Sequence, residues 1–411
     1  MSGHEVERAF RTLPERYLGA EEGFDATYHV RLGDVGQTWE VRCTTHGARV
    51  RLGVTRRTPD VTIGTDAATW LAMREGELSG IEAFAQRRLY ARGEMDLAIG
   101  FEGMFRLPGG RDPLLRIHRV RAGSLRISTL TMGEGPEDVV LLHGLGATKS
   151  SFFDTAAELS RQGYRVHALD LPGFGASSKP ARASYGPAFF ARAVLDVMDA
   201  LNIGRAHLVG NSMGGRVALE IGMTRPDRVG GIVLLCPAVA FIRRGLHPIV
   251  RLLRPEFGVL PHSLGRRRIE AQFWAMFADR DLVDPSLGDI VVDEFERIYR
   301  SPGARLAFLS SARSIYLEAP FGDRGFYPRL SELAPPALFV WSSHDKLVPP
   351  GFRRHVEQWL PAAEQLVLQG CGHAPQIERP EQTNGIVSRF LARVDPLGRP
   401  SGGVGPASRA A

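Results

Sequence analysis

The sequence has few of the residues that mark several classes of protein. Its 411 residues include three cysteines, Cys43, Cys236 and Cys371, which are too few and too scattered for a disulfide framework or a metal cluster. No apolar run approaches the roughly 18 residues of a membrane-spanning helix. The N-terminus, MSGHEVERAF, lacks the basic start and the apolar core of a secretory signal. We therefore expect a cytoplasmic protein without a metal or cofactor.

Lysine is also scarce, so the positive charge comes from arginine. Lysine occurs only at Lys149, Lys179 and Lys346, although lysine and arginine together number 51 against 45 acidic residues. The segment 241–268 holds seven arginines and one acid, a surplus that equals the net charge of +6. Interleaved with apolar residues, it fits a peripheral contact with an anionic membrane; the alternative is a solvated helix face. No nucleic-acid-binding motif accompanies the charge, so nucleic acid is not expected as a partner.

The remaining composition is that of a globular protein. Apolar residues make up 44% and charged residues 23% of the chain, both close to the globular average. At about 150 residues per domain, the length suggests two or three domains. Residues 108–114 are rich in Gly and Pro and poor in apolar side chains, which is typical of a linker. We expect one domain over residues 1–107 and another after the linker.

The second region alternates between short apolar runs and amphipathic stretches. Near-continuous apolar runs are what a parallel sheet requires when helices cover both of its faces. The alternation predicts an α/β fold, and residues 115–131 predict a leading hairpin. The predicted strands are 138–143, 165–170, 206–210, 231–235, 336–341 and 365–369, and the predicted helices are 150–162, 186–201, 213–224 and 380–393.

One interval breaks this rhythm. About 100 residues separate the fourth predicted strand from the fifth, far more than the dozen or so that a crossover needs. Aromatic residues recur there with helical spacing. We predict a helical cap over 238–330, inserted into a core made of 115–237 and 331–395. The Gly- and Pro-containing end, 396–411, is expected to be disordered.

The strongest motif is Gly-Asn-Ser-Met-Gly at residues 210–214. It follows a predicted strand and precedes a predicted helix, the context that identifies a nucleophile elbow. The turn would lift the hydroxyl of Ser212 above the sheet. The backbone N–H of Met213, at a helix N-terminus, would face the negative charge that develops on an attacked carbonyl oxygen. The alternative is a glycine-rich turn that contains an incidental serine.

A serine nucleophile needs a base, an orienting acid and a second oxyanion donor. His373 follows the last predicted strand, and Asp345 follows the strand before it. After the strand 138–143, the turn His-Gly-Leu-Gly can point the N–H of Leu145 at the same place as that of Met213. The sequence therefore predicts Ser212, Asp345 and His373 as catalytic residues, with Leu145 and Met213 as the oxyanion hole.

Together with Asp170-Leu-Pro-Gly-Phe-Gly, these motifs resemble the α/β-hydrolase superfamily over residues 115–394. The resemblance implies that fold and a Ser-Asp-His triad. Haloalkane dehalogenases and epoxide hydrolases of this fold carry an aspartate where this chain has Ser212. The asparagine before the serine, Asn211, is similar to the residue found there in meta-cleavage C–C hydrolases. Those enzymes commonly carry a tryptophan where this chain has Ala374.

The N-terminal region has no catalytic constellation. Alternating apolar residues predict half-buried strands, and a helix is predicted to begin at Thr65 or Asp66 and to end at Gly76. This α+β pattern resembles the sterol carrier protein 2 family over 24–107, on Pro59-Asp-Val-Thr-Ile, Trp70-Leu, Gly76-Glu-Leu, Ala83-Phe and Gly93-Glu-Met-Asp-Leu-Ala. The resemblance implies a tunnel for a fatty acyl chain or sterol-like ligand; the alternative is a module kept for dimerisation or stability.

These observations predict a serine hydrolase that cleaves an ester of a lipophilic substrate through an acyl-enzyme, in the manner of an esterase or lipase. The N-terminal module would concentrate or present lipid to it. Two alternatives stay open: a C–C bond hydrolase of ring meta-cleavage products, and a non-catalytic lipid carrier or scaffold.

Overall fold

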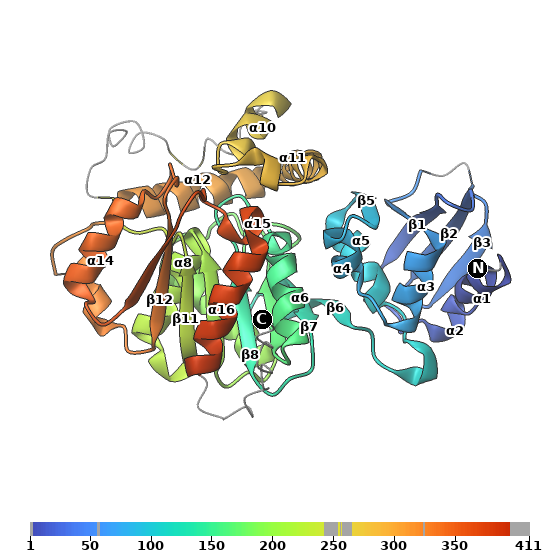
Figure 1. Ribbon diagram of the computed structural model, residues 1–411, viewed down its shortest axis with the longest axis horizontal. Coiled ribbons are helices and arrows are strands. Elements are labelled where there is room, and N and C mark those ends of the chain that lie inside the picture. Colours follow the sequence, from blue (N-terminus) through green and yellow to red (C-terminus); the bar gives the residue numbers. More distant parts are fainter. Residues whose placement is uncertain are drawn as a thin grey trace, which may run out of the picture.

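The chain folds into two domains that lie side by side (Figure 1). The computed structural model describes residues 3–55, 58–241, 254, 256, 265–323 and 325–394. The predicted disordered tail and most of the arginine-rich segment 241–268 lie outside the described residues, so the predictions made for them stay predictions. Of that segment, Arg266 pairs with the carboxylates of Asp289 (3.0 Å), Asp293 and Glu296 (3.6 Å). Among the described helices, none has the length and apolar character needed to cross a bilayer.

The N-terminal domain is an α+β unit built on a five-stranded sheet. The strand order is β3-β2-β1-β4-β5, with β1 and β4 parallel and the other neighbours antiparallel. Its elements are α1 (Gly3–Arg11), α2 (Leu13–Arg16), β1 (Asp25–Leu32), β2 (Gln37–Thr44), β3 (Gly47–Leu52), β4 (Val61–Thr65), α3 (Ala67–Glu75), α4 (Gly80–Ala85), β5 (Leu89–Gly93) and α5 (Met95–Gly103).

Local sequence explains where two of these helices begin and end. The Asp66 side chain accepts a hydrogen bond from the N–H of Thr69 and so caps α3, which ends at Gly76 with φ of 76°. Ser79 and Glu82 form a reciprocal capping box at the start of α4. These caps fix the positions of α3 and α4 on the sheet.

Aromatic rings fill the interior of the N-terminal domain. Phe10 of α1 is fully buried between Trp39 and Trp70. Its ring lies nearly parallel to both, with centroid distances of 4.5 and 4.4 Å and interplanar angles of 7° and 11°. Phe101 and Phe105 continue this cluster. Aromatic rings therefore occupy the centre of the domain, and the lipid tunnel that the family resemblance implies stays a prediction.

The second domain is an α/β unit with an eight-stranded, largely parallel sheet. The order is β13-β12-β11-β10-β8-β9-β7-β6, in which β6 pairs antiparallel with β7 and β7 antiparallel with β9. The strands are β6 (Leu115–Ala122), β7 (Leu125–Met132), β8 (Asp138–Leu142), β9 (Arg165–Leu169), β10 (Ala206–Asn211), β11 (Val229–Leu235), β12 (Ala337–Ser342) and β13 (Glu364–Leu368).

Helices cover both faces of this sheet. Side chains of α6 (Phe153–Arg161) and α16 (Pro380–Val394) pack on one face. Those of α7 (Pro187–Ala200), α8 (Met213–Thr224) and α14 (Arg353–Trp359) pack on the other. The central strands β8, β10 and β11 are buried along their whole length, as their near-continuous apolar sequences predict.

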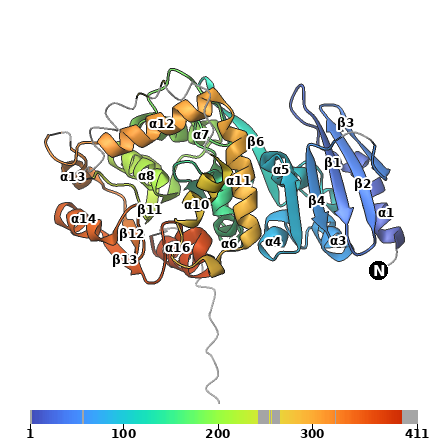
Figure 2. The ribbon, with the colours of Figure 1, turned by 90° about the horizontal axis from the view of Figure 1, so that it is seen from above.

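The described part of the interval between β11 and β12 is mainly helical. It contains α10 (Arg266–Trp274), α11 (Pro285–Tyr299), α12 (Pro302–Leu317) and α13 (Phe326–Arg329). In Figure 2, α10, α11 and α12 lie over the sheet, and α11 is on the side that faces the N-terminal domain. These helices therefore form a roof that covers the carboxyl ends of the strands, where the predicted site residues lie.

Candidate active site

Ser212 lies in the sharp turn between β10 and α8. Its φ of 51° and ψ of −114° are strained for a residue with a side chain. The turn needs glycine on both sides: a Cβ on Gly210 would lie 2.5 Å from the backbone of Gly214, and one on Gly214 would lie 1.9 Å from the carbonyl oxygen of Leu142. The backbone N–H of Ser212 donates to Leu235 O at 3.0 Å, which ties the turn to β11. The geometry is that of a nucleophile elbow.

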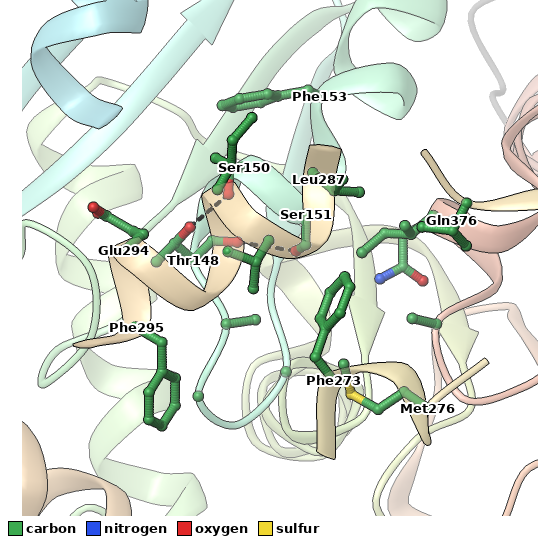
Figure 3. A pocket seen from close by; sticks show the side chains of 18 of the residues that line it. Thr148, Ser150, Ser151, Phe153, Phe273, Met276, Leu287, Glu294, Phe295 and Gln376 are labelled. Carbon is green, nitrogen blue, oxygen red and sulfur yellow. Dashed lines mark hydrogen bonds between the residues drawn. The ribbon is translucent and has the colours of Figure 1, made fainter. Parts of the chain in front are cut away.

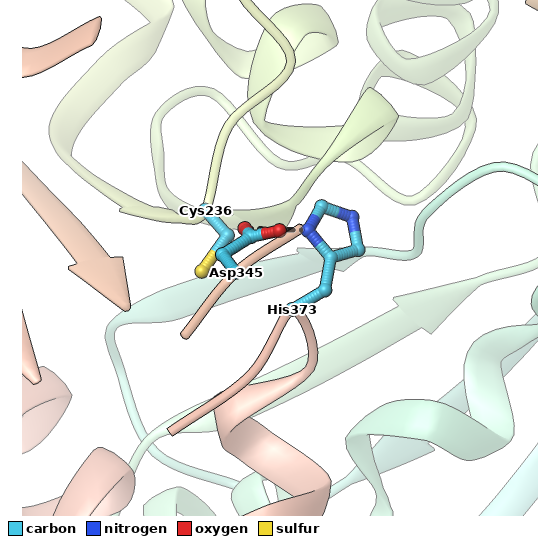
Figure 4. A group of neighbouring side chains, drawn as sticks. All are labelled: Cys236, Asp345 and His373. Atoms are coloured by element: carbon cyan, nitrogen blue, oxygen red, sulfur yellow. Dashed lines mark hydrogen bonds and ion pairs between the residues drawn. The ribbon is translucent and has the colours of Figure 1, made fainter. Parts of the chain in front are cut away.

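His373 and Asp345 form a buried pair beside this turn (Figure 4). His373 Nδ1 lies 2.7 Å from Asp345 Oδ2, and the two residues are 5% and 4% exposed. The other carboxylate oxygen, Oδ1, accepts the backbone N–H groups of Leu347 and Val348 at 2.8 and 2.9 Å. Because Nδ1 is held by the carboxylate, Nε2 is the ring nitrogen left for another partner.

Ser212 and His373 line the same pocket. In the part of the chain that the structure describes, no hydrogen bond joins Ser212 Oγ to His373. The structure thus pairs the predicted base with the predicted acid and leaves the hydroxyl unpaired at the pocket surface. Such contacts are often long without substrate and shorten in the reacting complex.

Two contacts that the sequence did not reveal hold the His373 loop in place. The Asn211 side-chain amide donates to His373 O at 3.1 Å and to Leu235 O at 3.0 Å. The His373 N–H donates to Met276 O, just after α10, at 2.6 Å. Both His373 contacts join segments more than 90 residues apart, so no local sequence motif predicts them.

Cys236 lies against the His373–Asp345 pair (Figure 4). One ligand atom from each of these three residues lies within 4.8 Å of the other two, a spacing at which they could surround a metal ion. Burial and the nearby Asp345 raise the pKa of the Cys236 thiol well above its ordinary value, whereas metals bind the thiolate. His373 Nδ1 is already engaged by Asp345. The group is therefore better explained as a base–acid pair packed against a neutral thiol.

The turn that holds Leu145 is fixed by His143. His143 Nε2 accepts the Leu171 N–H at 3.0 Å, and Nδ1 contacts Gly144 O at 2.7 Å. This pattern requires the neutral imidazole with its proton on Nδ1, and burial lowers the pKa of His143 accordingly. Because a trans peptide is planar, a Gly144 carbonyl held toward His143 directs the Leu145 N–H the opposite way. His143 is thus a buried residue that shapes the turn.

A buried ion pair supports the same turn from below. The Lys149 ammonium contacts Asp170 Oδ2 at 2.8 Å and also Asp96 of the N-terminal domain. Burial alone would lower the pKa of Lys149, but the two carboxylates raise it. Burial alone would raise the pKa of Asp170, but Lys149 lowers it. Asp170, the first residue of the motif Asp170-Leu-Pro-Gly-Phe-Gly, is therefore an anchor of the loop that carries Leu145.

The pocket above Ser212 has a volume of about 1,340 Å³, larger than the roughly 300–1,000 Å³ typical of ligand pockets. Leu145 lines it, and Met213 is buried at the start of α8. Figure 3 shows apolar side chains from α10 and α11, Phe273, Leu287 and Phe295 among them, around the pocket. The site can therefore hold a large, mainly apolar molecule next to Ser212.

Comparison with known proteins agrees with this geometry. Residues 139–380 match the alpha/beta hydrolase fold family, and residues 8–106 match the SCP-2 sterol transfer family. A 2-hydroxy-6-oxononadienedioate/2-hydroxy-6-oxononatrienedioate hydrolase from Burkholderia vietnamiensis is 31% identical over 280 residues, which cover 66% of this chain and 92% of that protein.

Two solved structures share the fold of the second domain. A membrane phospholipase A is 27% identical with a TM-score of 0.58, over 68% of this chain and 87% of that one. A meta-cleavage product hydrolase from Pseudomonas fluorescens IP01 is 24% identical with a TM-score of 0.56, over 67% and 97% of the two chains. With its elbow, its base–acid pair and its helical roof, this chain belongs to the α/β-hydrolase fold family and carries an SCP-2 sterol transfer domain at its N-terminal end.

Proposed function

We propose that Ser212, His373 and Asp345 form a catalytic triad that hydrolyses a carbonyl compound carrying a large apolar group. The observation that carries this proposal is the meeting of three features at one pocket. These are a strained serine with its hydroxyl unpaired among the described residues, a histidine held by a buried carboxylate, and about 1,340 Å³ of mainly apolar space beside them.

The reaction begins when Ser212 Oγ attacks the carbonyl carbon. Nε2 of His373 takes the hydroxyl proton, and Asp345 stabilises the imidazolium that forms. The backbone N–H groups of Leu145 and Met213 hold the oxyanion. Each such donor lowers the barrier by roughly 3 kcal/mol. His373 then gives its proton to the leaving group, and a water molecule, deprotonated by His373, releases the acid and restores Ser212.

Two kinds of scissile bond fit this scheme. In an ester, the C–O bond breaks and an alcohol leaves. In the C–C alternative, the bond from the carbonyl carbon to the next carbon breaks, and the leaving carbanion takes up a proton. The apolar pocket and the phospholipase neighbour support the ester.

The curated relatives support the C–C alternative better than the ester reaction, which the sequence favoured. They are 29–31% identical and are named as hydrolases of 2-hydroxy-6-oxo dienedioates. Asn211 points the same way, whereas Ala374 departs from the tryptophan common in meta-cleavage hydrolases. C–C hydrolysis is therefore a second candidate beside the ester reaction, and it is the one that these relatives favour; its substrate would carry an apolar substituent large enough for the pocket.

A substrate panel decides between the two bonds. Purified protein is offered p-nitrophenyl esters of two to sixteen carbons and, separately, a 2-hydroxy-6-oxo dienoate ring-cleavage product. Ester turnover that exceeds C–C turnover in kcat/KM supports the first candidate, and the reverse order supports the second.

A fluorophosphonate probe tests the proposed nucleophile directly. Labelling should disappear in Ser212→Ala and persist in Ser151→Ala, which removes a hydroxyl from the same pocket that is engaged with Thr148 O. Absence of both labelling and turnover in the unchanged protein would contradict the proposal and favour a non-catalytic lipid carrier.

A further inference from the structure

One wall of the pocket above Ser212 comes from the N-terminal domain. The lining contributed by β4, α4, β5 and α5 includes Gly64, Ile81, Phe84, Leu89, Tyr90 and Met95. Residues of α6 and α11 of the second domain line the same pocket, and Figure 2 shows α11 on the side that faces the N-terminal domain. The pocket therefore extends from the nucleophile past the helical roof to a different domain.

Polar contacts at the domain boundary hold this wall in place. Asp96 Oδ2 accepts a hydrogen bond from Ser128 Oγ at 2.6 Å, and Asp96 also neutralises buried Lys149. Arg87 pairs with Asp284, next to α11, at 2.9 Å. These contacts join the N-terminal domain to the sheet and to the roof, so the wall is part of the folded pocket and not a loosely tethered neighbour.

Apolar packing adds to the docking. Ile81 of α4 is 3% exposed, and it packs into the same buried cluster as Phe152 and Leu159 of the second domain. Burying such a side chain between domains removes apolar surface from water, which favours the docked arrangement.

The interior of the N-terminal domain offers far less room than this boundary. A cavity of about 40 Å³ lies behind Phe84, Leu89 and Met95, enough for a few water molecules but not for a lipid. The stacked ring of Phe10 occupies the centre of the domain. Space for an apolar ligand of this domain is thus found at its outer face, continuous with the pocket of Ser212.

We propose that this interdomain part of the pocket binds the linear fatty acyl chain of the substrate. The carbonyl lies at Ser212, and the chain passes α11 to end against Phe84 and Tyr90. A linear chain fits because the lined space reaches from Ser212 in one domain to Phe84 and Tyr90 in the other. The inference rests on the proposed function and gives the N-terminal domain the role of a substrate-binding wall.

The dependence of kcat/KM on acyl chain length tests whether the N-terminal wall binds the acyl chain. Each CH₂ that leaves water should raise kcat/KM by about three- to fourfold until the space is filled, so p-nitrophenyl dodecanoate should be a far better substrate than the butyrate. Ala85 is an exposed residue that lines the pocket, and Ala85→Trp fills the channel. We expect the dodecanoate-to-butyrate ratio of kcat/KM to fall at least tenfold.

The matched control is Gln86→Trp. Gln86 is the exposed neighbour of Ala85 and is absent from the pocket lining. It should keep the chain-length profile of the unchanged protein. An unchanged ratio in Ala85→Trp, or an equal fall in both variants, would overturn the proposal.

Binding separates failure of this inference from failure of the proposed function. Calorimetric titration of dodecanoate into Ser212→Ala needs no catalysis. We expect binding that weakens at least tenfold when Ala85→Trp is added. If no ester is hydrolysed but this pattern appears, the acyl site stands and the ester reaction fails. If esters are hydrolysed without chain-length preference and dodecanoate does not bind, or cholesterol binds in its place, the acyl site is wrong while the hydrolase remains.

Discussion

The two domains treat their apolar interiors in opposite ways. In the N-terminal domain, Phe10 lies stacked between Trp39 and Trp70, and the cavity nearby measures about 40 Å³. In the second domain, helices α10, α11 and α12 line a pocket of about 1,340 Å³ that begins at Ser212 and reaches the outer face of the N-terminal domain. An apolar interior is therefore not in itself a ligand site. The interior of the N-terminal domain is packed and stabilises the fold, whereas its outer face lines the pocket.

The largest effect is expected on catalysis at the pocket of the second domain. Ser212→Ala and His373→Ala should each lower kcat by roughly 10⁵-fold, because the hydroxyl and its base act as one unit. For the same reason, the double variant should be about as slow as either single one. Steady-state kinetics on the best substrate of the panel checks this. Losses that multiply in the double variant would show that the two residues act independently.

The next prediction concerns the stability that the packed interior of the N-terminal domain provides. Phe10→Ala should lower the free energy of unfolding by roughly 3–5 kcal/mol, because it removes a buried ring from an aromatic stack. Urea unfolding measures the loss. The matched control is Phe321→Ala at a half-exposed ring, where the cost should be small. Equal effects at both positions would mean that the stack contributes little.

A smaller effect is expected at the boundary between the domains. Asp96→Asn keeps an acceptor for Ser128 Oγ but removes a charge from buried Lys149, so it should cost roughly 1–3 kcal/mol. Glu21→Gln alters the exposed interdomain pair with Arg119, at 3.3 Å, and should cost less than about 1 kcal/mol. If urea unfolding gives equal costs, the buried contact does not hold the wall in place.

The smallest effect concerns the turn that carries Leu145. Burial lowers the folded-state pKa of His143 below its unfolded value, so at acid pH the unfolded chain binds the extra proton. The stability contributed by neutral His143 is complete above about pH 6.5 and is lost as the pH falls below it, by at most about 1.4 kcal/mol per pH unit. Unfolding free energies between pH 5 and 7 should show a smaller slope in His143→Gln than in the control His46→Gln, at an exposed position. Equal slopes would contradict the account.

Local patterns in the sequence predicted the scaffold closely. The predicted strand 138–143 corresponds to β8 (Asp138–Leu142), and 206–210 to β10 (Ala206–Asn211). Asp66 and Gly76 cap α3 as predicted. These features succeed because a buried parallel strand needs a continuous apolar run, and a helix end needs a particular neighbour.

The contacts that assemble the site were not predictable in this way. Asp96 reaches Lys149 across 53 positions, and Met276 holds His373 across nearly a hundred. Neither residue stands out in its own segment, since an aspartate on a helix and a backbone carbonyl are ordinary features. Phe10 also lies before residues 24–107, the range over which the sequence motifs resemble the sterol carrier family, although the family match itself begins at residue 8. Long-range packing, and not local pattern, makes the N-terminal domain a wall of the pocket.

The most direct test of the account is a crystal structure of the full chain inactivated by a dodecyl fluorophosphonate. The account predicts a bond from phosphorus to Ser212 Oγ, with the phosphoryl oxygen facing the N–H groups of Leu145 and Met213. The alkyl chain should pass α11 and end against Phe84 and Tyr90. A phosphorus bound to another residue, or a chain that touches no atom of the N-terminal domain, would contradict it.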